Sequence, residues 1–402
     1  MTEDEKQNTN PWQQNLIKLY VLKGLAFAWF PIPTIMLFYQ AKGLSIEDGL
    51  LLKTILSASL FVFEIPSGYL ADRLGRKVSL VAGGGLWTVA VLVYCLGENF
   101  AAFAAAEILT GFAGSLISGA DTALGFDSLV QLGREGDYRK FEGRLGAVAG
   151  ITEAVCGIVG GMAAAVSLVY PFGLQAIALF FYFLIATSLV EPPRQVSGGQ
   201  EWQKLGEVVK FALIEHKPIQ ALIFFAAVCT NVTFLMVWLS QEYLASVALP
   251  TASFGIAWAL FHGVMSWVSL GAAAWENWLG RKGAFFSIVL ILGLAYLGLG
   301  LTQAQWGIVW IAAVYGGRGL KLPLILNALN HYVSSDFRAT VLSVNSFVFR
   351  LGFVGVGTSA GWLTQTVGLQ STFLIFGGIV LALGGWGWWR LQNVGVFEAP
   401  TG

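Results

Sequence analysis

The strongest constraint on this chain is a series of long apolar stretches that recurs along its whole length. A bilayer core of about 30 Å is spanned by roughly 20 apolar residues in a helix, which pairs its own backbone amides. About twelve stretches of that length are present, so the sequence predicts an all-α membrane protein. They cover approximately residues 16–39, 49–71, 78–97, 101–126, 144–167, 170–190, 218–243, 252–274, 284–302, 306–330, 339–364 and 369–391.

Composition supports a lipid-facing surface and excludes several other classes of protein. The chain is 56% hydrophobic and 11% charged, whereas soluble domains carry about 25% charged residues. A formal net charge of zero gives no electrostatic support for a nucleic-acid partner. The three cysteines and three histidines are scattered, with no spacing that suits a metal, so we expect neither a metal site nor a cofactor.

Lys and Arg side chains predict the orientation of the chain in the membrane. They gather in the N-terminal region, the even-numbered connections and the C-terminal end, and Lys42 is the one in an odd-numbered connection. Because positively charged loops stay inside, both termini are expected in the cytoplasm. The first apolar stretch is too long for a signal peptide and is interpreted as a retained first span of a plasma-membrane protein.

An internal repeat divides the chain in two. Residues 71–77 read Ala-Asp-Arg-Leu-Gly-Arg-Lys and residues 276–282 read Glu-Asn-Trp-Leu-Gly-Arg-Lys, each after the second span of its half. Such duplication is typical of transporters built from parallel repeats. The predicted parts are a cytoplasmic tail, a six-helix bundle, a cytoplasmic linker with a surface helix from Trp202 to Phe211, a second six-helix bundle and a second tail. Their ranges are 1–15, 16–190, 191–217, 218–391 and 392–402.

The first copy carries a recognisable motif. The segment from Gly68 to Lys77 reads Gly-Tyr-Leu-Ala-Asp-Arg-Leu-Gly-Arg-Lys, and it is similar to the Gly-x-x-x-Asp-Arg-x-Gly-Arg-Arg/Lys signature of the major facilitator superfamily. Residues 118–129 and 338–343 also resemble bacterial members, many of which are exporters with unassigned substrates. The resemblance implies two pseudosymmetric six-helix bundles that transport by alternating access. The expected gating residues are Gly68, Asp72, Arg73, Gly75, Arg76 and Lys77.

Each part of the signature suggests a physical role. Gly68 and Gly75 permit close helix approach and a tight turn. Asp72 can accept hydrogen bonds from the N-terminus of another helix, which the resemblance implies is the start of span eleven, near Arg338. The basic residues would hold neighbouring helices and lipid phosphates, although a basic loop that only fixes topology remains an alternative. The second copy keeps Gly280, Arg281 and Lys282 but has Asn277 and Trp278 where the first has Asp and Arg, so a charged latch is expected in the first half only.

Ionisable residues inside spans are candidates for function, because a charge at the bilayer centre costs about 3 kcal/mol or more. The N-terminal half has acidic candidates for proton coupling, of which Glu64 and Glu153 are preferred, and the C-terminal half has basic ones. Ion pairing is the competing interpretation for each of them. The proton-coupling candidates are Glu64, Glu107, Asp121 and Glu153.

The basic residues of the second half could contact substrate. Arg318 and Lys321 share one helix face, and with Arg350 they could hold a carboxylate or phosphate. Trp29 and Trp258 could stack on a ring-bearing substrate or simply pack in the core. Pro31, Pro33, Pro66 and Pro323 could each allow a bend in a span.

Enzyme motifs are not supported. Gly357-Thr358-Ser359-Ala360-Gly361 matches the Gly-x-Ser-x-Gly pattern but lies inside an apolar span, where it is better interpreted as a packing face. No phosphate-binding loop is present to drive transport with ATP.

The sequence therefore predicts a proton-coupled secondary transporter, and the resemblance to the superfamily alone implies export of a small organic compound or drug. It is expected to act as a monomer, with a small-molecule substrate, protons and membrane lipid as partners. Proton-coupled uptake of an organic anion is the first alternative, and a non-transporting membrane receptor or scaffold is the second.

Overall fold

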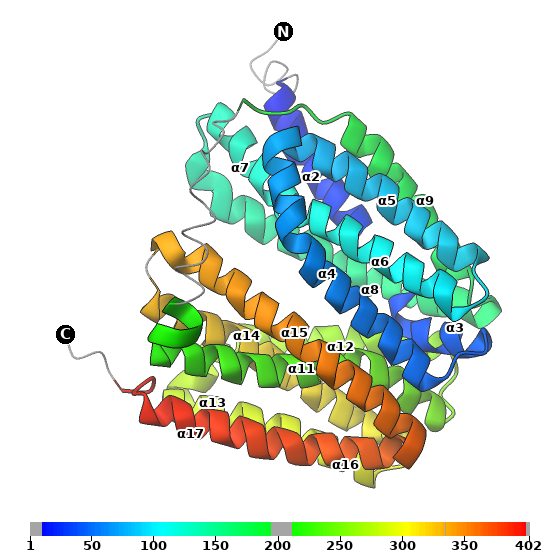
Figure 1. The fold of residues 1–402 in the computed structure, drawn as a ribbon, viewed down its shortest axis with the longest axis vertical. Helices are drawn as coiled ribbons and strands as arrows, with labels where there is room; N and C mark the ends of the chain where they lie inside the picture. Colours follow the sequence, from blue (N-terminus) through cyan, green and yellow to red (C-terminus); the bar gives the residue numbers. More distant parts are fainter. Residues whose placement is uncertain (1–9, 194–210, 334, 399–402) are drawn as a thin grey trace. The chain divides into compact units, whose positions relative to one another are not determined.

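The computed structural model describes residues 10–193, 211–333 and 335–398, and every regular element in these ranges is a helix (Figure 1). The predicted surface helix lies outside the described residues except for Phe211. The first part contains α2 (Pro11–Ala26), α3 (Ile35–Ala41), α4 (Ile46–Leu74), α5 (Arg76–Leu96), α6 (Phe100–Ile117), α7 (Ala120–Gln131), α8 (Tyr138–Val166) and α9 (Tyr170–Thr187). The second part contains α11 (Lys217–Ser246), α12 (Ala252–Leu270), α13 (Ala272–Leu301), α14 (Ile308–Tyr332), α15 (Ser335–Val367), α16 (Leu369–Ile379) and α17 (Gly385–Asn393).

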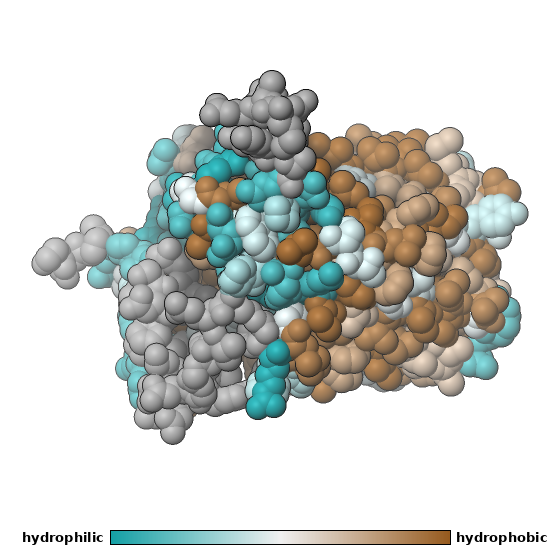
Figure 2. All heavy atoms as spheres, turned by 90° about the horizontal axis from the view of Figure 1, so that it is seen from above, coloured by the Kyte–Doolittle hydropathy of each residue, from teal (hydrophilic) through white to brown (hydrophobic). Residues whose placement is uncertain are grey.

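Most predicted spans are present as single apolar stretches of helix. Within the described residues, 10 helical segments are long and apolar enough to cross a membrane. The other two predicted spans are the first, which is broken, and α4, a helix of 29 residues that carries Lys53 and Glu64. On the face drawn in Figure 2, apolar residues cover a broad band and hydrophilic residues gather toward one end. The all-α membrane class is confirmed.

Two spans are interrupted within the membrane part of the chain. The first breaks between α2 and a short 3-10 helix at Ile32–Thr34, where Pro31 and Pro33 lack the amide hydrogens that a continuous helix needs. The predicted fourth span breaks between α6 and α7 at Gly119, whose φ is +79°. Pro66 and Pro323 lie inside continuous helices. The sequence allowed a bend at the first of these sites, and none was expected at the second.

The chain forms two compact units. Unit 1 comprises Met1–Leu44, Ile55–Ser197 and Pro250–Ala259, and unit 2 comprises Ser45–Thr54, Gly198–Leu249 and Leu260–Gly402. Each unit thus includes the start of one helix from the other half of the sequence. These two exchanged segments start at residues 45 and 250, and the Leu-Gly-Arg-Lys copies start at 74 and 279, so both pairs are 205 residues apart.

Helix packing repeats between the units. In unit 1, α5 packs against α6 and α9, and α2 packs against α7, α8 and α9. In unit 2, α13 packs against α14 and α16, and α11 packs against α14, α15 and α17. These pairs correspond when the spans are numbered within each half, so the duplication seen in the sequence extends to the packing. The boundaries predicted for the tails and the linker stay predictions.

The two Leu-Gly-Arg-Lys copies also share an unusual backbone conformation. Gly75 has φ 111° and ψ 149°, and Gly280 has φ 68° and ψ 161°. This region of backbone space is essentially accessible to glycine alone. The conserved glycine of the repeat therefore turns the chain in the same way in both halves.

Candidate functional site

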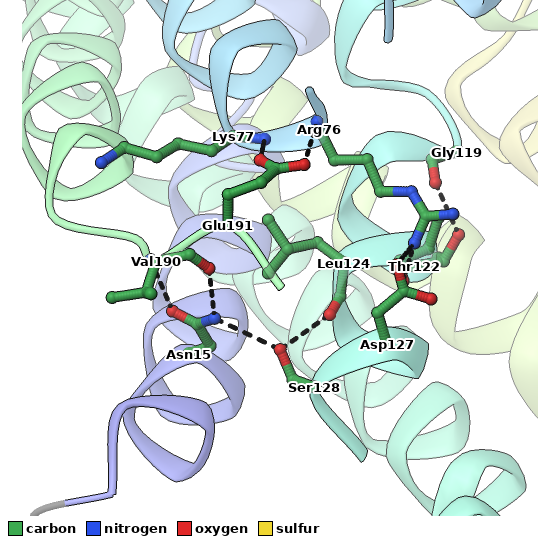
Figure 3. A network of polar contacts seen from close by, with 11 residues as sticks. Asn15, Arg76, Lys77, Gly119, Thr122, Leu124, Asp127, Ser128, Val190 and Glu191 are labelled. Carbon is green, nitrogen blue, oxygen red and sulfur yellow. Dashed lines mark hydrogen bonds and ion pairs between the residues drawn. The ribbon is translucent and has the colours of Figure 1, made fainter. Parts of the chain in front are cut away.

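The last two residues of the signature segment, Arg76 and Lys77, are held by the carboxylate of Glu191, which follows α9 in the sequence. The backbone amide of Arg76 donates to Glu191 Oε1 at 2.9 Å and that of Lys77 donates to Glu191 Oε2 at 2.7 Å (Figure 3). Both oxygens of Glu191 therefore cap the N-terminus of α5, where the free amides carry partial positive charge. A Cβ on Gly75 would lie 3.1 Å from the Glu191 carboxyl carbon. Only glycine fits this turn without crowding.

The Arg76 side chain joins α5 to α7. Its guanidinium donates to the carbonyl of Ala123 at 2.7 Å and forms an ion pair with Asp127. Arg73 lies over the ring of Tyr69, with 5.0 Å between the guanidinium carbon and the ring centre. Arg76 thus bridges two helices of unit 1, as expected for a residue that holds neighbouring helices.

A buried asparagine extends the network to α2. Asn15 is fully buried, and its Nδ2 donates to the Val190 carbonyl at 2.8 Å and to Ser128 Oγ at 3.2 Å. The Val190 amide donates back to Asn15 Oδ1 at 3.0 Å. The start of α2, the middle of α7 and the chain after α9 are therefore tied together beside the α5 terminus (Figure 3).

Sequence reasoning identified part of this network. The side chains of Asp72 and Arg338 lie outside what the structure describes, so the expected latch between them stays a prediction. Among the described residues, a Cβ at Gly68 would meet no atom within 4 Å, and the close helix contact expected there stays a prediction. Glu191 was missed as a site residue. Its signal was a lone acidic residue directly before Pro192-Pro193, where an apolar span ends.

The second copy makes different contacts. Arg281 lies 3.9 Å from the Glu276 carboxylate, and the Lys282 ammonium lies 5.4 Å from the centre of the Trp388 ring. The Trp388 indole donates to the Lys282 carbonyl at 3.0 Å. The ion pair of Arg76 thus has a longer counterpart at Arg281, and Lys282 contacts an aromatic ring.

Two acidic candidates of unit 1 are buried in contrasting surroundings. Glu107, only 1% exposed, accepts a hydrogen bond of 2.8 Å from the Tyr39 hydroxyl, which lies 3.1 Å from the Tyr94 hydroxyl. Asp121 instead forms an ion pair of 2.8 Å with Lys23. It lies in the first turn of α7, directly after the break at Gly119. Asp121 is therefore ion-paired, whereas Glu107 is hydrogen-bonded to a tyrosine hydroxyl.

The preferred candidates Glu64 and Glu153 are half-buried, on α4 and α8. The four acidic candidates thus come from four different helices.

Unit 2 has a buried cationic centre at the middle of its helices. Lys321 is 6% exposed and lies near the middle of the 25-residue α14. Its Nζ donates to Thr230 Oγ1 at 2.8 Å and to Thr233 Oγ1 at 3.3 Å, both from the middle of α11. A rise of 1.5 Å per residue places this position roughly 20 Å from either end of α14, at the depth where transporters of this architecture bind substrate.

The other basic candidates lie on α14 and α15. Arg318 lies one turn before Lys321, close enough for electrostatic repulsion between them. Its guanidinium carbon is 6.0 Å from the Tyr315 ring centre, and the His262 ring centre is 5.4 Å from that of Tyr315. Arg350 is half-buried on α15. The structure thus brings Arg318 and Lys321 together, as their spacing predicted.

The tryptophan candidates make ordinary packing contacts. Trp29 stacks on Phe27 with 4.8 Å between ring centres. Trp258 is 5% exposed and lies against α8, where a Cβ on Gly157 would be 2.7 Å from its ring. Within the described ranges, no group of three His, Cys, Asp or Glu side chains could hold a metal ion.

Comparison with known proteins identifies the family. The model described as Major Facilitator Superfamily matches residues 21–352. The chain belongs to the Major Facilitator Superfamily. The Bacillus subtilis (strain 168) protein named "Uncharacterized MFS-type transporter YxaM" is 22% identical over 366 residues, which are 88% of this chain and 90% of that protein. "Multidrug resistance protein MdtG" of Escherichia coli O6:K15:H31 (strain 536 / UPEC) is 22% identical over 410 residues, and the alignment covers 96% of this chain and 97% of that protein.

Solved structures show the same fold. The nucleoside transporter NupG aligns with a TM-score of 0.79 at 14% identity, covering 97% of this chain and all of that one. A D-xylose-proton symporter aligns with a TM-score of 0.70 at 14% identity, covering 93% of this chain and 97% of that one. The chain is therefore a multi-pass membrane transporter with the major facilitator fold, and its family and fold are those of transporters and not of enzymes.

Proposed function

We propose that this transporter exports a small organic compound or drug across the plasma membrane in exchange for protons. The observation that carries the proposal is the burial of ionisable side chains within apolar spans of both units. Glu107 and Asp121 are buried in unit 1, and Lys321 is buried in unit 2. Groups that bind and release protons away from water can couple a proton gradient to transport. Export is favoured by the likeness to a protein named for multidrug resistance.

The mechanism in this proposal is alternating access between two six-helix bundles, with both termini in the cytoplasm. The signature residues act as the gate. Their support is the network that fixes Arg76 and Lys77 to Glu191 and Asp127, because a rigid platform lets an adjacent latch open and close as one piece. The protein works as a monomer, and its partners are a small-molecule substrate, protons and surrounding lipid.

Proton-coupled uptake of an organic anion is the second candidate. Arg318 and Lys321 favour it, since two cations on one face of α14 at mid-membrane depth suit a carboxylate or phosphate. Arg318 cannot carry the proton because a guanidinium stays charged at working pH. Arg350 completes the cationic set in this variant of the proposal.

A thermal-stabilisation screen tests the proposal. Purified protein is melted with a library of metabolites and drugs at two pH values, because a ligand that binds only the folded state raises the melting temperature. The export proposal expects organic compounds whose stabilisation depends on pH. Stabilisation by the same compounds at both pH values, to the same extent, would contradict proton coupling. Stabilisation mainly by anions, and its loss in Arg318→Ala and Arg350→Ala, would favour the uptake candidate.

A further inference from the structure

Lys321 has a hydrogen-bond environment that suits an uncharged amine. Among the described residues its Nζ has two hydrogen-bond acceptors, the hydroxyls of Thr230 and Thr233. An ammonium group has three N–H donors, whereas a neutral amine has two N–H donors and a lone pair. The two hydroxyls therefore accept from both N–H groups of a neutral amine. In the ammonium form, the third N–H would have no acceptor among these groups.

The two threonines can serve either protonation state. Thr233 Oγ1 lies 3.0 Å from the Cys229 carbonyl and 3.1 Å from the Thr230 carbonyl, so its hydrogen is directed to the backbone. Its oxygen lone pairs then remain available to Lys321 whether the amine is charged or neutral. A carboxylate in that place would hold the ammonium form by its charge. Hydroxyls carry no charge and favour the ammonium much less than a carboxylate does, so a proton can come and go without loss of these hydrogen bonds.

The charged and titratable groups around Lys321 do not neutralise an ammonium. Arg318, on the same helix, has the same sign of charge. On α11 the Cys229 thiol is close enough to interact with Lys321, and on α12 His262 is close enough to interact with Arg318. From α13, the Tyr296 hydroxyl donates to a carbonyl of α11 at 2.6 Å. No carboxylate among the described residues forms an ion pair with Lys321. Removing the proton would abolish the cost of an uncompensated charge at this depth.

We propose that Lys321 is a proton-binding group of the transport cycle, neutral in its threonine cradle and charged when a third acceptor reaches it. The reaction is the reversible transfer of one proton between the amine and water, and the third acceptor is an anionic group or water admitted as the site opens. This inference rests on the proposed proton-coupled transport and deepens it. It assigns one coupling group to the C-terminal half, where the sequence had suggested only a substrate contact.

The protonation state of Lys321 can be observed directly in the full-length protein. Lysine side chains labelled with ¹⁵N give different NMR shifts for amine and ammonium, and Lys321→Arg identifies the Lys321 signal by its loss. At about pH 8, a lysine with the ordinary pKa of about 10.4 stays charged. Lys18, which is half-buried and donates to the Ser188 carbonyl at 2.6 Å, is the matched control. We expect the amine signal for Lys321 and the ammonium signal for Lys18.

An ammonium signal at Lys321 under these conditions overturns the inference. If Lys321→Arg does not fold, Thr230→Val provides the assignment, since removal of one hydroxyl displaces the Lys321 signal alone.

Transport separates this inference from the proposed function. The probe is the compound that gives the largest stabilisation in the two-pH screen, reconstituted with wild type or Lys321→Arg in liposomes. Arginine keeps the charge but cannot release the proton. We expect Lys321→Arg to lose about tenfold or more of its gradient-driven accumulation relative to its own exchange without a gradient. Accumulation by wild type that ignores the pH gradient overturns the proposed function, whereas coupled transport by both proteins overturns the role of Lys321 alone.

Discussion

Glu191 joins the chain after α9 to the start of α5, so its replacement measures how firmly the signature is held. Glu191→Ala removes both acceptors of the Arg76 and Lys77 amides, at 2.9 and 2.7 Å. Loss of an N-terminal cap costs about 0.5–2 kcal/mol, and loss of a negative charge at a helix N-terminus costs a further ~0.3–1 kcal/mol. We therefore expect the free energy of unfolding to fall by about 1–3 kcal/mol. Glu191→Gln keeps one acceptor oxygen and should cost about half as much.

The assay is the melting temperature of the purified protein in detergent. A folding unit of about 200 residues loses roughly 2–4 °C for each kcal/mol. Glu98→Ala is the matched control, since its carboxylate is also paired, with Lys42 at 2.6 Å, but is 73% exposed. Such a surface pair is worth about 0–1 kcal/mol. The reasoning is refuted if Glu191→Ala has the melting temperature of the wild type, or if Glu98→Ala lowers the melting temperature as much as Glu191→Ala does.

Three further predictions test the repeat, a helix cap and the gate. Gly75→Ala and Gly280→Ala should each lower the free energy of unfolding by roughly 1–3 kcal/mol because both glycines have a positive φ. The loss should be larger at Gly75, where a Cβ would crowd a carboxylate 3.1 Å away. Equal melting temperatures of the two variants would contradict this. His216 Nδ1 accepts from the amide of Ile219, the third residue of α11, at 3.4 Å, and burial lowers the pKa of His216 below its ordinary 6.5. The stability that this cap contributes is therefore present above pH 6.5 and is lost as pH falls through the lowered pKa. His216→Asn should make the fall in melting temperature below pH 6.5 less steep. An unchanged slope would count against this prediction. Asp72→Asn should impair transport more than Asn277→Ala because only the first copy has the charged residue, and equal, near-normal transport would show that the carboxylate is dispensable.

The sequence predicted features that depend on periodicity and on local chemistry. Span length and hydropathy indicated the helices, and Leu-Gly-Arg-Lys indicated the duplication that the packing repeats. The break at Pro31 and Pro33 followed from missing amide hydrogens. Arg318 and Lys321 were placed together by helical spacing alone.

Features that depend on contacts between distant segments were missed. Glu191 caps a helix that begins 115 residues earlier, and the residues next to Glu191 in the sequence do not indicate that partner. The pairing of Asp121 with Lys23 joins residues 98 apart. The break before α7 depends on Gly119 alone, and one glycine within an apolar stretch is equally consistent with a continuous helix. Tertiary packing decided all three.

Flux into everted membrane vesicles tests proton-coupled export most directly. Everted vesicles expose the cytoplasmic face, and the probe is the compound that gives the largest stabilisation in the two-pH screen. The account predicts that vesicles containing the protein accumulate the compound when their interior is acidic, and that collapse of the pH gradient with an ionophore abolishes the accumulation. Accumulation that persists without the gradient, or that occurs only in right-side-out vesicles with an acidic exterior, would contradict it.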